Sequence, residues 1–298
     1  MKTNLFMKTN LAAFALAALA FSGPSYGFDT VTVTATADNT MYEYEGFGQD
    51  LSNGTGSYLF AGVTASGLRR RGLINFDISD SIPPGSTIQS VALTLHVSQA
   101  TFGPRLVTLH RALASWGEGT SDAPGMEGGG TAAKTNDASW RHRFYDSTLW
   151  NTPGGDFFIA SSSGAFVDES DFYTWPSTDS LVADVQGWLD NPASNFGWVI
   201  VGDESASATA KRFDSRQNSL DSFRPALLIT FTLPGGPTCD PDMNQDGNAD
   251  QGDIDYLINV IAGGDNPTNI DPDFNRDGNA DQGDLDALVN VIAGGACP

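Results

Sequence analysis

Polar and apolar residues alternate along the chain between residues 28 and 232. In residues 31–36 each valine or alanine is followed by a threonine, which is the two-residue period of a strand with one buried face. β-Branched and aromatic residues dominate further short segments at 72–77, 91–97, 106–110, 198–201 and 226–231. Turns rich in glycine, proline and asparagine separate such segments. Many short strands without long helices between them predict an antiparallel β-sandwich.

One segment of this region has a helical period instead. From about residue 178 to residue 190, four apolar residues fall on one helix face: Leu181, Val185, Trp188 and Leu189. Asn191 and Pro192 then end the pattern. The region 28–232 is therefore predicted to be mainly β with one short helix.

The C-terminal part contains the same unit twice, at residues 240–264 and 271–295. Each copy reads Asp-x-Asn-x-Asp-Gly-x-x-Asp-x-x-Asp and is followed by an apolar helical pattern. A hard cation takes six or more oxygen ligands, and this spacing supplies them as in an EF-hand loop. We therefore predict two Ca²⁺ ions, because a flexible Asn/Asp-rich tail, the alternative, has no reason to carry apolar residues at helical spacing.

The predicted calcium ligands occupy equivalent positions of the two loops. In the first loop they are Asp242, Asn244, Asp246, the backbone carbonyl of Asn248, Asp250 and Asp253, and in the second they are Asp273, Asn275, Asp277, the carbonyl of Asn279, Asp281 and Asp284.

The twelfth loop position is Asp in both copies, where an EF-hand has Glu. In this and in its tandem arrangement the tail, residues 239–298, resembles type I dockerin modules. The resemblance implies a small all-α domain of two calcium loops and helices that binds a protein partner. It assigns partner contacts to loop positions ten and eleven, which are Gln251, Gly252, Gln282 and Gly283. Many cellulosomal members carry Ser-Thr there, whereas this chain has Gln-Gly in both copies. We therefore expect a cohesin-like or divergent receptor and not a cellulosomal cohesin.

Charge and cysteine placement also set this tail apart. The chain has a formal charge of -21, and residues 239–298 contribute -12 of it, from thirteen Asp and one Arg. Such density favours folding coupled to calcium binding. Cys239 and Cys297 are the two cysteines of the chain and bracket the tail. In an oxidising compartment a disulfide between them is expected, with two free thiols as the alternative.

The N-terminal residues 1–27 have the pattern of a secretory signal peptide. Lys2 and Lys8 precede an apolar run at 11–21, and small residues lead to a predicted cleavage after Gly27. The apolar run is too short to span a bilayer comfortably, and no other segment approaches that length. We therefore expect a secreted protein, extracellular or associated with the cell surface, with a Pro/Gly linker at 233–238 before the tail.

Seven segments of the region 28–232 carry a further resemblance, namely 38–42, 69–78, 82–88, 181–191, 197–199, 212–216 and 224–227. In these segments the region is similar to the DNRLRE domain family. The similarity implies a jelly-roll-like β-sandwich of the kind found in secreted bacterial proteins, some of which are classed as carbohydrate-binding modules for acidic polysaccharides.

Sugar binding needs aromatic faces and polar or cationic groups. The tryptophans in or beside Gly/Ser-rich loops are the stacking candidates, whereas Trp188 and Trp198 lie in periodic apolar patterns and are expected in the core. The candidate glycan-binding residues are Trp116, Trp140, Trp150, Trp175, Arg141 and Arg143. The alternative is that the tryptophans are core residues and the arginines pair with carboxylates of the same domain.

The sequence shows no H-E-x-x-H, G-x-S-x-G or P-loop motif. The pI of 4.1 argues against nucleic-acid binding, because phosphate binding needs a basic face. We therefore predict a non-catalytic protein that binds a polysaccharide or another surface polymer and is anchored by its calcium-dependent tail. A polysaccharide lyase or glycoside hydrolase is the rival, because paired carboxylates need no sequence spacing. A structural cell-surface protein is the third possibility.

Overall fold

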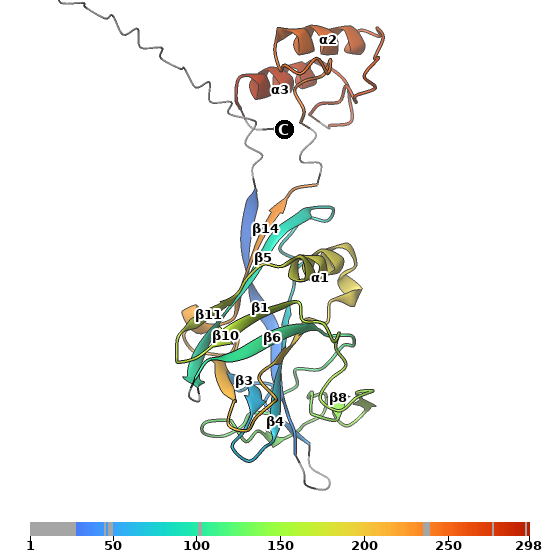
Figure 1. Cartoon of the computed structure of the whole chain (residues 1–298). Helices are drawn as coiled ribbons and strands as arrows, with labels where there is room; N and C mark the ends of the chain where they lie inside the picture. The colour runs from blue at the N-terminus through green and yellow to red at the C-terminus, as the bar shows by residue number, and fades with distance from the viewer. Residues whose placement is uncertain are drawn as a thin grey trace, which may run out of the picture. The chain divides into compact units, whose positions relative to one another are not determined.

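The computed structural model describes residues 28–44, 46, 50–100, 103–234, 239–275, 277–295 and 297–298. These residues fall into two compact units, Phe28–Asp240 and Pro241–Pro298 (Figure 1). The predicted signal peptide, residues 1–27, and the greater part of the predicted linker, residues 235–238, lie outside the described residues.

The larger unit is built from antiparallel strands, and each strand predicted from alternation is present. The strands are β1 (Asp29–Tyr42), β2 (Leu51–Ser52), β3 (Tyr58–Val63), β4 (Arg69–Phe76), β5 (Thr87–Ala100), β6 (Arg105–Arg111), β7 (Thr131–Ala132), β8 (His142–Phe144), β9 (Thr148–Leu149), β10 (Ser163–Val167), β11 (Phe172–Trp175), β12 (Trp198–Val201), β13 (Lys211–Asp214) and β14 (Ala226–Thr232). Twelve of them form one sheet, and β8 and β9 form a separate two-stranded sheet.

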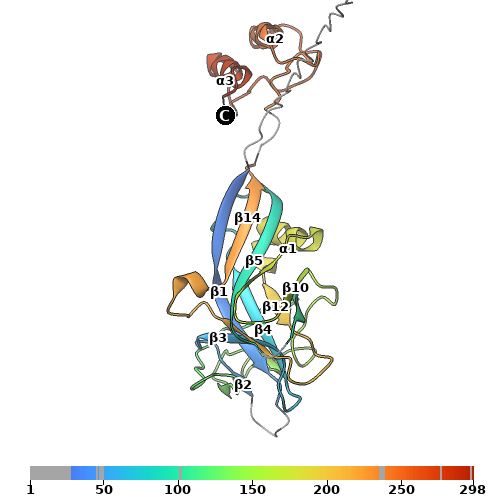
Figure 2. The same ribbon diagram turned by 60° about the vertical axis from the view of Figure 1, so that its left-hand side comes forward.

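Six strands of the large sheet close on themselves in the order β1, β4, β3, β13, β5 and β14. Closure is possible because the first half of β1 pairs with β14 and its second half with β4. Figure 2 shows β1, β14 and β5 side by side. The predicted jelly-roll-like sandwich is therefore wrong, because the unit contains a closed six-stranded antiparallel barrel with further strands. Register shifts at Ala35–Ala37 and Thr230–Phe231 disturb the regular pairing of these strands, and such irregularities leave no period in a sequence.

The predicted helix is confirmed as α1 (Asp179–Asp190). The hydroxyl of Thr178 accepts a hydrogen bond from the backbone N–H of Leu181 and caps the helix. The apolar face, Leu181, Val185, Trp188 and Leu189, is buried in the main core with the inward side chains of the strands. Trp188 packs against Trp198 there, with ring centroids 4.5 Å apart.

A second, smaller core lies outside this one. The connection from β6 to β10, residues 112–162, contributes Ala112, Ala138 and Trp150 to it. Strand residues Met41 and Leu73, both fully buried, complete it together with Val199. The long connection is therefore a packed layer and not a surface loop.

The smaller unit contains two helices of 11 residues each, α2 (Gln251–Ile261) and α3 (Gln282–Ile292). The rest of its described residues form turns and irregular chain, so the predicted all-α dockerin-like domain is wrong as a description of the fold. The acidic loops and the chain around them take up most of this unit, so few residues remain to form helix. Leu257 and Leu288 are fully buried. Cys239 and Cys297 form a disulfide, as predicted. The helices that the structure describes are too short or too polar to span a bilayer.

Candidate functional site

The first acidic loop is folded around its own carboxylates. The side chain of Asp242 accepts hydrogen bonds from the backbone N–H groups of Asp246 (3.0 Å) and Gly247 (2.8 Å). Gly247 has φ 92°, a left-handed conformation that glycine adopts without strain. The fully buried Asp253 accepts from the N–H groups of Asn244 (3.0 Å) and Asp250 (2.8 Å). The first and last carboxylates therefore fix the curve of the loop.

The second loop repeats this scheme. Asp273 accepts from the N–H of Gly278 at 2.9 Å, and Gly278 also has φ 92°. Asp284, fully buried like Asp253, accepts from the N–H groups of Asn275 (2.9 Å) and Asp281 (2.7 Å). Two copies with different flanking residues fold alike, so the loop geometry follows from the shared residue pattern.

The ninth loop residue begins each helix. Asp250 accepts a hydrogen bond from the N–H of Gly252, and Asp281 does so from Gly283, both at 2.7 Å. Each forms a capping box with the acidic residue three positions later. The helix N-terminus and its dipole thus hold the carboxylates at the end of each loop.

The residues of the loops fit a hard cation by their donor chemistry, which is oxygen throughout. Oδ1 of Asp273 is buried and has no hydrogen-bond partner among the described residues. Across the part of the chain that the structure describes, however, no group of three or more His, Cys, Asp or Glu side chains is gathered as metal ligands. The side-chain oxygens of Asn244 and Asn275 accept backbone N–H groups at 2.9 and 3.0 Å. A hydrogen bond from the N–H of Asn248 lowers the pKa of Asp246.

The residues predicted to contact a partner have different environments. Gln251 and Gln282 are exposed, and their amides donate to Asp255 and Asp286. Gly252 and Gly283 lie against the loops instead. A Cβ at Gly252 would lie 3.1 Å from Nδ2 of Asn244, and one at Gly283 would lie 2.8 Å from Nδ2 of Asn275. These glycines make room for the loop asparagines.

Two of the four stacking candidates are core residues. Trp175 is fully buried in the main core, and its Nε1 donates to the carbonyl of Val107 at 2.8 Å. Trp150 is 4% exposed in the second core and donates to the carbonyl of Ser139 at 3.0 Å. Neither presents a ring face to a sugar. Trp188 and Trp198 are buried as predicted.

Trp116 and Trp140 pack against the second core and are partly buried. Nε1 of Trp116 donates to the carbonyl of Phe196 at 2.8 Å, and the guanidinium of Arg71 lies 5.0 Å from the Trp140 ring centre. The structure therefore does not bring the four tryptophans together into one stacking surface.

The two candidate arginines have partners in the same unit. Arg141 makes two hydrogen bonds to Asp50, at 3.0 and 2.9 Å, and these raise the pKa of Arg141. Arg143 donates to the carbonyl and hydroxyl oxygens of Ser115 at 3.0 and 2.9 Å. The alternative that arginines pair with carboxylates of the same domain is confirmed for Arg141.

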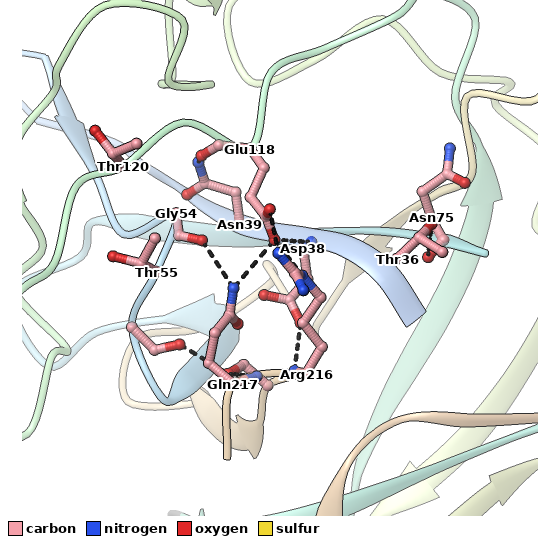
Figure 3. A network of polar contacts seen from close by, with 12 residues as sticks. Thr36, Asp38, Asn39, Gly54, Thr55, Asn75, Glu118, Thr120, Arg216 and Gln217 are labelled. Carbon is pink, nitrogen blue, oxygen red and sulfur yellow. Dashed lines mark hydrogen bonds and ion pairs between the residues drawn. The ribbon is translucent and has the colours of Figure 1, made fainter. Parts of the chain in front are cut away.

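Sequence reasoning missed a polar network around Asp38, Glu118 and Arg216 (Figure 3). Arg216 binds both oxygens of Glu118 at 2.5 Å, and its backbone N–H donates to Oδ2 of Asp38 at 2.6 Å. Glu118 also accepts from the N–H of Asp38 and from Gln217. The network joins β1, the β6–β10 connection and the segment after β13.

The environments of Asp38 and Glu118 fit a structural role better than acid–base catalysis. Burial raises the pKa of Asp38 to about 7, and its Oδ1 is buried with no hydrogen-bond partner among the described residues. Asp38 is 1% exposed, so a substrate does not reach it, and Glu118 is neutralised by Arg216. The only signal in the sequence was that Asp38 and Arg216 lie in segments that carry the DNRLRE resemblance.

In comparisons with known proteins, no family model matches the chain and no curated protein matches it. The family resemblances of the two regions therefore stay predictions.

Proposed function

We propose that this chain is an exported, non-catalytic binding protein. Its smaller unit binds two Ca²⁺ ions and attaches to a protein receptor, cohesin-like or divergent, and its barrel unit binds a polysaccharide. The observation that supports the proposal best is the duplicated loop. In both copies equivalent carboxylates accept hydrogen bonds from equivalent backbone N–H groups.

Calcium would be held by the carboxylates of Asp242, Asp246 and Asp253 in the first loop, with Asn244 and Asp250 beside them. The equivalent residues of the second loop would hold the second ion, including Oδ1 of Asp273, which has no hydrogen-bond partner among the described residues. When bound, the cation would neutralise negative charge that otherwise repels itself in a tail of formal charge -12, from thirteen Asp and one Arg. Binding would therefore stabilise the folded tail by mass action.

The receptor proposal is supported by a pair of apolar side chains on the two helices. Ile258 and Val289 occupy equivalent positions of α2 and α3, and each is 46% exposed. A β-branched apolar side chain at the same place in both copies suits a partner that recognises either copy. The last residues of the loops cap these helices. Loss of calcium would therefore disturb the helix surface that the receptor contacts.

Calcium titration of the full chain tests the proposal. Calorimetry should give two ions per chain, with a gain of helical signal in circular dichroism. Asp242→Ala and Asp273→Ala should each reduce the stoichiometry to one, because each removes a carboxylate from one loop. Asp265→Ala is the matched control, since this exposed aspartate lies between the loops and should leave two sites. No binding, or equal loss in the control, would contradict the proposal.

A further inference from the structure

The outer face of the sheet formed by β1, β14, β5 and β11 is lined mainly by hydroxyl-bearing and small side chains, with the exposed Leu228 among them. On β1 the outward positions are Thr30, Thr32 and Thr34, all exposed, while Val33 and Ala35 between them are buried in the main core. On β14 the inward Leu227 and Ile229 are fully buried, so the residues between and beside them point outward.

The strand register brings these outward residues into rows across the sheet. One row is Thr30, Thr230 and Ser90, the next is Thr32, Leu228 and Ala92, and the third is Thr34, Ala226, Thr94 and Thr174. Neighbouring strands lie about 4.8 Å apart, so each row repeats side chains at that spacing. We call this surface the threonine face.

The threonine face carries no charged side chain in its rows. The strands β5, β11 and β14 contain no Asp, Glu, Lys or Arg, and the first eight residues of β1 contain only Asp29. In a chain of which 17% of the residues are charged, with a net charge of -21, such a surface is a marked exception. Exposed protein surfaces normally carry charges of both signs, which limit association.

An aromatic group lies at one end of the threonine face. Phe172 pairs with His96 across the strands and is 46% exposed. The His96 ring lies 4.7 Å from the ring of Phe172 and stacks on Phe223 at 3.9 Å. Asp214 is hydrogen-bonded to Nδ1 of His96 and fixes this ring. The face thus combines rows of hydroxyls with a supported, exposed aromatic ring.

We propose that the threonine face binds an extended, uncharged polysaccharide. Hydroxyls of Thr32, Thr34 and Thr94 would exchange hydrogen bonds with sugar hydroxyls, and Phe172 would pack on the apolar face of a sugar ring. The rows contain no cation that would select an acidic polymer. A second copy of this chain is a poor occupant, because two molecules of charge -21 repel each other. The inference rests on the proposed polysaccharide binding and narrows its substrate class.

The test is a depletion assay with the full chain. Insoluble cellulose, chitin and β-1,3-glucan are the uncharged probes, and alginate and pectate gels are the acidic ones. We expect binding to at least one uncharged polymer with little dependence on salt, because no ion pair is involved. Phe172→Ala and Thr32→Lys should each weaken binding by about tenfold, through loss of the stacking ring and through an unpaired charge on the face.

Matched controls separate the face from general surface effects. Phe166→Ala removes a phenylalanine that is 68% exposed on β10, and Thr135→Lys adds a charge at an exposed turn. Both should bind like the wild type, and all four variants should keep its melting temperature. Binding to acidic polymers alone would overturn this inference and leave the proposed function standing, whereas binding to neither kind would contradict both this inference and the proposed polysaccharide binding. A dimer in sedimentation velocity that Thr32→Lys abolishes would assign the face to self-association and also overturn it.

Discussion

Asp38 is a single residue that should set part of the pH dependence of barrel stability. Burial raises the pKa of its carboxyl to about 7 in the folded protein, against 3.8 for the unperturbed group. The folded state therefore keeps a proton that the unfolded state releases. Asp38 therefore contributes most to the free energy of unfolding below pH 3.8, where both states are protonated, and this contribution is lost as the pH rises through about 7.

Asp38→Asn should remove this pH dependence, because the amide stays neutral and its oxygen can still accept from the N–H of Arg216. Urea unfolding midpoints at fixed calcium should fall less between about pH 4 and pH 7 in the variant than in the wild type. Asp29→Asn, at an exposed position of the same strand, is the control and should keep the wild-type slope. An unchanged slope in Asp38→Asn would assign the pH dependence to other groups.

Trp150 provides a second prediction at the residue scale. Its ring is buried in the second core and its Nε1 is hydrogen-bonded to Ser139. Trp150→Ala should therefore lower the free energy of unfolding by about 3 to 5 kcal/mol, the usual cost of removing a large buried aromatic. Thermal melts followed by intrinsic fluorescence would measure it. A weakened glycan affinity at an unchanged melting temperature would instead return Trp150 to the binding residues.

These tryptophans show where sequence reasoning stops. A tryptophan in a Gly/Ser-rich stretch is expected to be exposed, because loops usually lie on the surface. Here the β6–β10 connection has its own core, whose partners Met41, Leu73 and Val199 are distant in sequence. Trp188 and Trp198 were assigned correctly because the periodic patterns that bury them are local. The outward threonines of β1 were equally visible, but their rows depend on strand register, which alternation does not give.

At the scale of elements, the sequence predicts which strands and which barrel helix exist, but not which strands pair with each other. Alternation located the strands, and a cap, an apolar face and a stop signal located α1. The sequence does not say which strand edges pair. The barrel joins β3 to β4 through only two residue pairs, Gly62–Arg70 and Val63–Arg69, and no local pattern encodes so short a ladder.

Gly62 belongs to this short ladder and also lies against the segment that precedes β13. It has φ 114°, and a Cβ there would lie 2.8 Å from Cα of Ala210 and 2.9 Å from the carbonyl oxygen of Thr209. Gly67→Ala is the matched control, because Gly67 has φ 87° but a Cβ added there would meet open space. Both variants should lose about 1 to 2 kcal/mol for the left-handed conformation. Gly62→Ala should lose a further 1 to 3 kcal/mol, roughly the cost of overpacking. Equal losses in chemical denaturation would show that the close packing of Gly62 against Thr209 and Ala210 does not affect stability.

At the scale of the whole molecule, the repeated unit in the tail was the strongest signal in the sequence. Its loops and helices form as the spacing indicates, because their hydrogen bonds join residues within one copy. The expectation of an all-α domain failed because it came from resemblance and not from counting the residues left for helix. The assignment of Gly252 to a partner surface has the same origin, and contact with Asn244 accounts for that glycine.

The exposed apolar residues of the two helices allow a test of attachment with the full chain as bait. If either copy can engage the receptor, Ile258→Lys alone and Val289→Lys alone should each leave calcium-dependent capture from the native secretome within about twofold of the wild type, because one surface remains. The double variant should lose capture, as chelator should in the wild type. Calcium stoichiometry and helical signal must stay unchanged in all three variants, since both side chains are 46% exposed and lie outside the loops. Ile261 and Ile292 end the same helices and are only partly exposed, so they are poorer sites for this substitution. Loss of capture in Ile258→Lys alone would show that the first copy binds the receptor and that the second supports it structurally.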